Sequence, residues 1–144
     1  MVRSRIVTEE SIIIRPEVHR TWLILLITFG LLGILAGADK FLGILTYWEK
    51  YLSPLATAIV PISPEGFMMI VGAIEILAGI LVFTNPRIGG AAVGVWLLFI
   101  AINLLSLNFY PNLPTYNDIA VRDIVMAMGA FALSILSSRK EIIR

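Results

Sequence analysis

One carboxylate stands at the centre of a long apolar segment. Residues 66–84 form an apolar run, and Glu75 is about nine residues from either end. At 1.5 Å per residue it would lie roughly 13–14 Å from each end of a helix, near the middle of a bilayer core about 30 Å thick. An ionisable group there is costly unless it is protonated, paired or hydrated. Glu75 is therefore a candidate proton-exchanging group, and the alternative, a structural hydrogen bond between helices, stays open.

Two cations are expected to face the same interior. Lys40 follows Gly37 by three residues, so both lie on one face of the first apolar run. Arg122 shares a helical face with Gly129 in the last apolar run. Because small residues mark the faces where membrane helices approach each other, both cations are predicted to point into the bundle.

These residues suggest one polar pocket at one end of a bundle. Lys40, Glu75, Asn103 and Arg122 are predicted to line it, with the two cations as electrostatic partners of the carboxylate. Trp96 lies near the middle of its apolar run, where it either stacks on a flat ligand or packs in the core. The competing interpretation is that the cations lie at the membrane edge and extend into water.

Four other residues are interpreted as markers of the membrane edge. Asp39, Asp118 and Asp123 fall at the ends of apolar runs, where charged side chains reach water. Trp22 is expected to be an anchor at the headgroup level.

Composition places the chain in a membrane. Of its 144 residues 58% are hydrophobic, the mean hydropathy is +0.91, and the net charge is +1. Soluble domains are about 45–50% apolar, and the basic residues here cluster at the ends, so a nucleic-acid partner is not expected. No cysteine is present, which excludes disulfides and thiolate-bound metals or clusters, and the one histidine, His19, excludes a bis-histidine haem within one chain. The chain alone is thus expected to hold no cofactor.

The apolar pattern predicts an all-α four-helix membrane bundle. The segment joining the first two spans contains three prolines and the aromatics Tyr47, Trp48 and Tyr51, and we expect it to lie at the extracytoplasmic interface. Gly30, Gly33 and Gly37 lie on one face of the first span and predict a packing seam. The expected organisation is a cytoplasmic segment 1–20, spans at about 21–40, 65–84, 88–107 and 118–137, and a basic cytoplasmic tail 138–144.

The distribution of Lys and Arg predicts the orientation. Eight of the 11 cations (4 + 1 + 3) fall in the N-terminal segment, the turn after Pro86 and the tail, and three fall on the other side. Because basic loops stay cytoplasmic, both termini are expected inside a cell membrane that the chain crosses several times.

Several motifs resemble one family of small membrane proteins. The segment 37–41 (GADKF), the segment 71–81 (VGAIEILAGIL) and Arg87 before a small-residue helix are similar to the DoxX/DoxD-like family of four-span proteins. The resemblance covers about residues 22–137. It implies shared roles for Gly37, Lys40, Glu75, Gly79 and Arg87, and the chain departs from the family pattern at position 26, a leucine where many members carry arginine.

The resemblance implies an accessory subunit of a respiratory or sulfur-oxidising complex. The family is named for subunits associated with a thiosulfate:quinone oxidoreductase and a terminal quinol oxidase. By this analogy the chain would bind quinone beside a partner subunit, as an oxidoreductase subunit that is not catalytic alone, with Glu75 exchanging protons. Two alternatives stay open: a non-catalytic scaffold or assembly protein that packs through Gly33 and Gly37, and a small transporter that works as a homo-oligomer.

Overall fold

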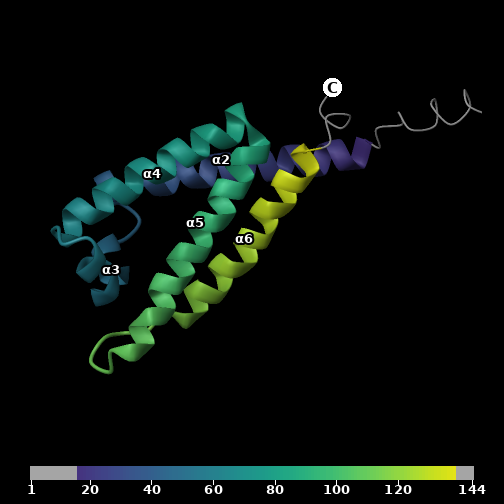
Figure 1. Cartoon of the computed structure of the whole chain (residues 1–144). Helices are drawn as coiled ribbons and strands as arrows, with labels where there is room; N and C mark the ends of the chain where they lie inside the picture. Colours follow the sequence, from purple (N-terminus) through teal and green to yellow (C-terminus); the bar gives the residue numbers. More distant parts are fainter. Residues whose placement is uncertain (1–15, 139–144) are drawn as a thin grey trace, which may run out of the picture.

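Four long helices build the structure, a computed structural model that describes residues 16–138 (Figure 1). They are α2 (Pro16–Leu42), α4 (Pro64–Thr84), α5 (Pro86–Ser106) and α6 (Asn117–Ser137). Each is long and apolar enough to cross a membrane, and no strand occurs in the described part of the chain. The predicted all-α four-helix bundle is confirmed, and the chain is a multi-pass membrane protein.

The turn between α4 and α5 is a single residue. Asn85 closes α4 through its backbone N–H, which donates to Leu81, and its side chain accepts from the backbone N–H of Ile88 to open α5. Pro86 follows at the first helical position, where a missing N–H costs nothing. The two helices therefore run antiparallel with almost no loop between them.

Glycines bring α2 and α4 into close contact. A Cβ on Gly33 would lie 2.7 Å from the carbonyl oxygen of Glu75, and one on Gly37 would lie 2.5 Å from that of Gly72. From the other side, a Cβ on Gly79 would lie 2.7 Å from the carbonyl oxygen of Gly30. The seam predicted from the glycine spacing is confirmed, and it joins α2 to α4 within one chain.

A second seam joins α5 to α6. A Cβ on Gly90 would lie 2.8 Å from the carbonyl oxygen of Ala130 and 2.9 Å from the backbone nitrogen of Ser134. Ser134 also donates its hydroxyl to the carbonyl of Arg87 at 2.6 Å. The bundle thus consists of two close pairs, α2 with α4 and α5 with α6, which contact each other less extensively.

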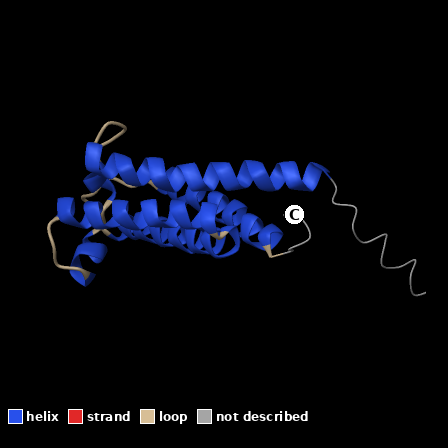
Figure 2. Cartoon of the chain, turned by 90° about the horizontal axis from the view of Figure 1, so that it is seen from above, coloured by secondary structure: helices blue, strands red, loops and turns tan. Residues whose placement is uncertain are grey.

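The two pairs cross and splay apart toward one end. Figure 1 shows them converging at the α4–α5 turn and diverging toward α3 (Pro54–Ile59), whereas the view in Figure 2 shows them nearly aligned. We call the converging part, residues 16–30, 79–94 and 130–138, the closed half, and the remainder, residues 31–78 and 95–129, the open half. The main apolar core, which includes Phe29, Val82, Ala130 and Leu133, lies largely in the closed half.

Trp22 does not anchor the chain at the headgroup level as expected. Its side chain is buried, and its indole N–H donates to the hydroxyl of Ser137 on α6 at 2.7 Å. α2 begins at Pro16, five residues before the expected start of the span at Thr21, so Trp22 lies within the helix and packs inward. The interpretation of Trp22 as an interfacial anchor is therefore wrong.

The segment 43–63 folds over the open end of the bundle. It turns at Gly43, whose φ of 62° favours glycine, and contains a short 3-10 helix, η2 (Trp48–Tyr51), followed by α3. Ser53 caps α3 by accepting from the backbone N–H of Ala56. The segment therefore carries aromatic and apolar side chains to the space between the splayed pairs.

Candidate functional site

A buried ion pair joins α2 to α4 in the open half. The ammonium Nζ of Lys40 lies 2.6 Å from Oε2 of Glu75, and the two side chains are only 5% and 8% exposed. Side chains tilt toward the N-terminus of their own helix, and the two helices are antiparallel. Lys40 lies level with Gly72. Its side chain therefore extends along the bundle toward the closed half, and that of Glu75 extends toward the open end. The ammonium and the carboxylate meet between the two backbone positions. The predicted pairing of Lys40 with Glu75 is present.

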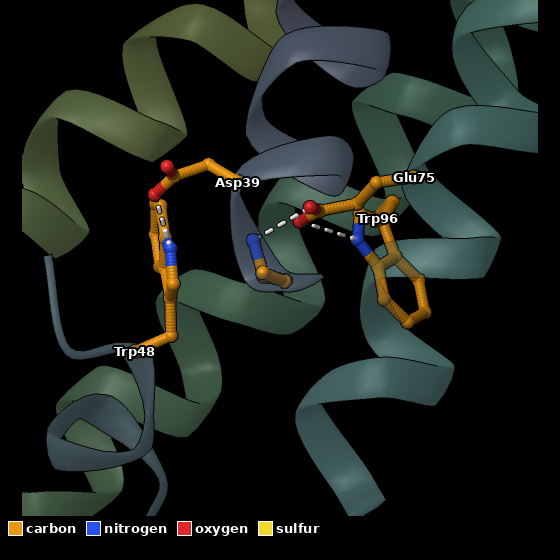
Figure 3. Close-up of polar contacts among 5 residues, drawn as sticks. Asp39, Trp48, Glu75 and Trp96 are labelled. Atoms are coloured by element: carbon orange, nitrogen blue, oxygen red, sulfur yellow. Dashed lines mark hydrogen bonds and ion pairs between the residues drawn. The ribbon is translucent and has the colours of Figure 1, made fainter. Parts of the chain in front are cut away.

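Two indole rings enclose this ion pair. Trp96 on α5 donates its N–H to Oε1 of Glu75 at 3.4 Å, and the ring centroid of Trp48 lies 3.8 Å from Nζ of Lys40. Figure 3 shows the Trp96 indole nitrogen directed at the Glu75 carboxylate, with Trp48 on the other side of the site. A cation over an aromatic face is attracted by the ring quadrupole, most strongly when it is desolvated. The carboxylate and the ammonium are both stabilised without water.

Asp39 positions Trp48 and does not mark the membrane edge. Its Oδ1 accepts from the backbone N–H groups of Ile44 and Leu45, at 2.9 and 3.0 Å, and its Oδ2 accepts from the indole of Trp48 at 2.7 Å. The residue is 5% exposed. The expectation that Asp39 extends into water is wrong, because its carboxylate binds the turn that ends α2 and orients the ring above Lys40 (Figure 3).

Asn103 fastens the covering segment to α5. Its Oδ1 accepts from the backbone N–H of Ser53 at 3.1 Å, and its Nδ2 donates to the carbonyl of Tyr51 at 2.7 Å. These backbone groups lie at the last residue of η2 and just before α3, where no helix satisfies them. The side chain borders the predicted pocket, but its amide is already engaged in holding the segment 43–63 in place.

A partly open cavity of about 720 Å³ lies beside the ion pair. Its walls come from the open halves of all four long helices and from the segment 43–63. Most of the wall is apolar, and ligand pockets in proteins commonly have 300–1,000 Å³. All five predicted site residues line this cavity: Lys40, Glu75, Trp96, Asn103 and Arg122.

Arg122 was expected to point into the bundle and Asp123 to reach water, but Asp123 is the more buried of the two. Both line the cavity, but the Arg122 side chain is 66% exposed, whereas that of Asp123 is only 7% exposed. Nε of Arg122 lies 4.0 Å from Oδ1 of Asp123. Of the two cations expected beside Glu75, Lys40 pairs with it and Arg122 does not, within the described residues. The interpretation of Asp123 as an edge marker is wrong, because its side chain points between the splayed helix pairs, whereas Asp118 is exposed as expected.

Sequence reasoning missed three site residues. Trp48 was expected only as an interfacial aromatic, and Asp39 and Asp123 were expected in water. One signal was available for Asp123: it lies three and four residues before Met126 and Ala127 on the inward face of its helix. The other two positions depend on a turn whose path the sequence does not specify.

No metal site accompanies this cluster. Within residues 16–138 no group of three His, Cys, Asp or Glu side chains could hold a metal ion. Comparisons of the chain with protein-family models, curated proteins and solved structures found no match. The resemblance to the DoxX/DoxD-like family therefore stays a prediction from the motifs.

Proposed function

We propose that the chain is a quinone-binding accessory subunit of a membrane redox complex. The observation that carries the proposal is the apolar cavity with one enclosed ion pair, Lys40–Glu75, in its wall. A quinone has a flat ring with polar oxygens and an isoprenoid tail. Such a ligand requires a mostly apolar pocket with a few convergent polar groups, which is the arrangement found here.

The border of the cavity suits entry from the bilayer. Phe99 and Ile102 on α5 both line it and are 59% exposed, and Leu55 on α3 is also exposed. In a membrane-spanning helix such apolar surfaces contact lipid tails. A hydrophobic ligand dissolved in the bilayer would reach the cavity without crossing water.

Glu75 is the proposed proton-exchanging group. Its carboxylate lies at the cavity wall between a cation and an indole donor, which suits a group that releases and regains a proton as a neighbouring oxygen changes charge. Electrons would come from a partner subunit, because a chain without cysteine has no ligands for an iron–sulfur cluster. The DoxX/DoxD-like motifs support the same assignment.

Tryptophan fluorescence tests the cavity directly. The chain has three tryptophans, of which Trp48 and Trp96 line the cavity. Titration of the protein in nanodiscs with a decyl-substituted benzoquinone is expected to quench their emission saturably. Ala78→Phe places a phenyl ring in the cavity and is expected to weaken the saturable part strongly, whereas Ala73→Phe, on the exposed face of α4, is expected to leave it unchanged. Equal quenching in both variants would refute quinone binding at this site.

Proton exchange is tested in the complex extracted from its own membrane. Glu75→Gln is expected to slow quinone turnover at least about tenfold, a loss in the range of general acid–base catalysis. Glu65→Gln, at the exposed start of the same helix, is the matched control. If no redox subunit co-purifies and native mass spectrometry finds only phospholipid on the chain or its oligomer, the respiratory assignment is wrong.

The scaffold alternative required an exposed glycine surface on α2, and in the structure that surface is covered by α4. Gly33 and Gly37, expected to pack against a partner protein, instead contact α4 of the same chain. They are not available as a docking face while the bundle is intact.

A further inference from the structure

Asp123 is a buried carboxylate with no hydrogen-bond donor. Its side chain is 7% exposed and lines the cavity, and among the described residues none donates a hydrogen bond to it. The nearest cation, Arg122, approaches no closer than 4.0 Å and is itself 66% exposed. Buried carboxylates are almost always paired or hydrogen-bonded, and the Asp123 oxygens are not sealed off from the cavity, so a ligand there could supply the donor.

The other carboxylate and the one amide side chain of the cavity are already engaged. Glu75 binds Lys40 and Trp96, and the amide of Asn103 binds the backbone of the segment 43–63. Asp123 lines the same cavity as Glu75 and Lys40. Among the described residues, a ligand in the cavity would therefore meet one buried carboxylate that accepts no hydrogen bond, that of Asp123.

We propose that Asp123 accepts a hydrogen bond from a ring hydroxyl of the ligand, so that the cavity selects the hydroquinone over the quinone. This inference rests on the proposed function and names the redox form that the site prefers. It assigns Asp123 as a binding residue, whereas Glu75 keeps its role in proton exchange.

The preference follows from hydrogen-bond chemistry. An ionised carboxylate accepts hydrogen bonds and cannot donate them. A quinone offers two carbonyl oxygens, which also only accept, whereas a hydroquinone offers two hydroxyl donors. Binding a quinone would leave the carboxylate buried and unpaired, and binding a hydroquinone would satisfy it with a charge-assisted bond.

The experiment compares the two redox forms on the same protein. Calorimetric titration of protein-loaded nanodiscs, with empty nanodiscs as the blank, gives the affinity for a decyl-benzoquinone and, anaerobically, for its hydroquinone. Wild-type protein is expected to bind the hydroquinone at least about tenfold more tightly, the loss typical of an unpaired buried acceptor. Asp123→Asn and Asp123→Leu are expected to abolish the difference, and Asp118→Asn, an exposed aspartate on the same helix, is expected to retain it.

The possible results separate this inference from the proposed function. Equal wild-type affinity for both forms, or an unchanged preference in Asp123→Asn, overturns the inference and leaves quinone binding intact. Binding of neither form overturns both. A third result also overturns the inference: dodecylammonium binds saturably and depends on Asp123, while hydroquinone is not preferred over quinone. The donor to Asp123 would then be a cation. The wild-type measurement decides the matter even if an Asp123 variant fails to fold.

Discussion

The two halves of the bundle use the same four helices in opposite ways. In the closed half, Gly79 and Gly90 allow backbones to touch, and the polar contact between Trp22 and Ser137 is a neutral hydrogen bond. In the open half α2 and α4 still touch at Gly33 and Gly37, but the two pairs diverge from each other and enclose charged groups beside a cavity. An apolar side chain packed between membrane helices has no desolvation cost to offset, whereas each buried charge needs a partner of opposite charge or a hydrogen bond.

This contrast assigns the stability of the bundle mainly to the closed half and the proposed binding site to the open half. The closed half joins the two helix pairs where Gly89 of α5 packs directly against the backbone of Val82 on α4, a contact that leaves little room for movement. The open half can then keep an apolar space without collapsing, because the segment 43–63 is tied to α5 through Asn103. Variants in each half test this division, beginning with the largest expected effect.

Lys40→Met is expected to lower the free energy of unfolding most. It leaves Glu75 buried and without its cation, and breaking a buried ion pair on one side typically costs about 3–5 kcal/mol. Unfolding of the purified protein by SDS titration in mixed micelles measures the loss.

The double variant Lys40→Met/Glu75→Leu provides the control. Because it removes both charges together, it is expected to recover most of the lost stability, as apolar replacements of buried pairs often do. If the double variant is as unstable as the single one, the ion pair is not the cause of the loss.

Gly79→Leu breaks the closed half. Its Cβ would lie 2.7 Å from the carbonyl oxygen of Gly30 and 2.8 Å from the backbone nitrogen of Ile34, so α2 must move away. Overpacking of this kind costs about 1–3 kcal/mol. Ala73→Leu, on the exposed face of the same helix, is expected to change the unfolding free energy by less than about 0.5 kcal/mol.

The sequence was sufficient to predict the features that depend on one helix at a time. Span positions follow from apolar length, and the glycine seam follows from residues three and four apart on one face. The pairing of Lys40 with Glu75 also followed, since a cation and a carboxylate on glycine-rich faces of adjacent spans have few other partners in lipid.

The features that depend on how two helix pairs cross were not predictable. Asp123 and Arg122 are adjacent in sequence and both line the cavity, and only the splay of α5 and α6 from α2 and α4 decides which of them is buried. The role of Asp39 depends on the turn at Gly43, which brings Trp48 back over α2. Such positions are set by contacts distant in sequence or by irregular backbone.

Ser137→Ala is expected to have a smaller effect in the closed half. It removes the acceptor of the buried Trp22 indole N–H, and a neutral hydrogen bond contributes about 1 kcal/mol to stability. Ser138→Ala is the matched control, because that hydroxyl is exposed and bonds only within its own helix turn. SDS titration that shows equal losses for the two variants would mean that the Trp22–Ser137 contact does not stabilise the closed half.

Arg122→Gln is expected to have the smallest effect, although the sequence alone makes Arg122 resemble Lys40. Its guanidinium is 66% exposed and lies 4.0 Å from its acidic neighbour, and ion pairs of exposed side chains contribute about 0–1 kcal/mol. The unfolding free energy should therefore stay within about 0.5 kcal/mol of wild type, against a loss several times larger for Lys40→Met. A loss as large as that of Lys40→Met would show that Arg122, and not Lys40 alone, neutralises the buried carboxylates, and the division of roles between the two cations would fail.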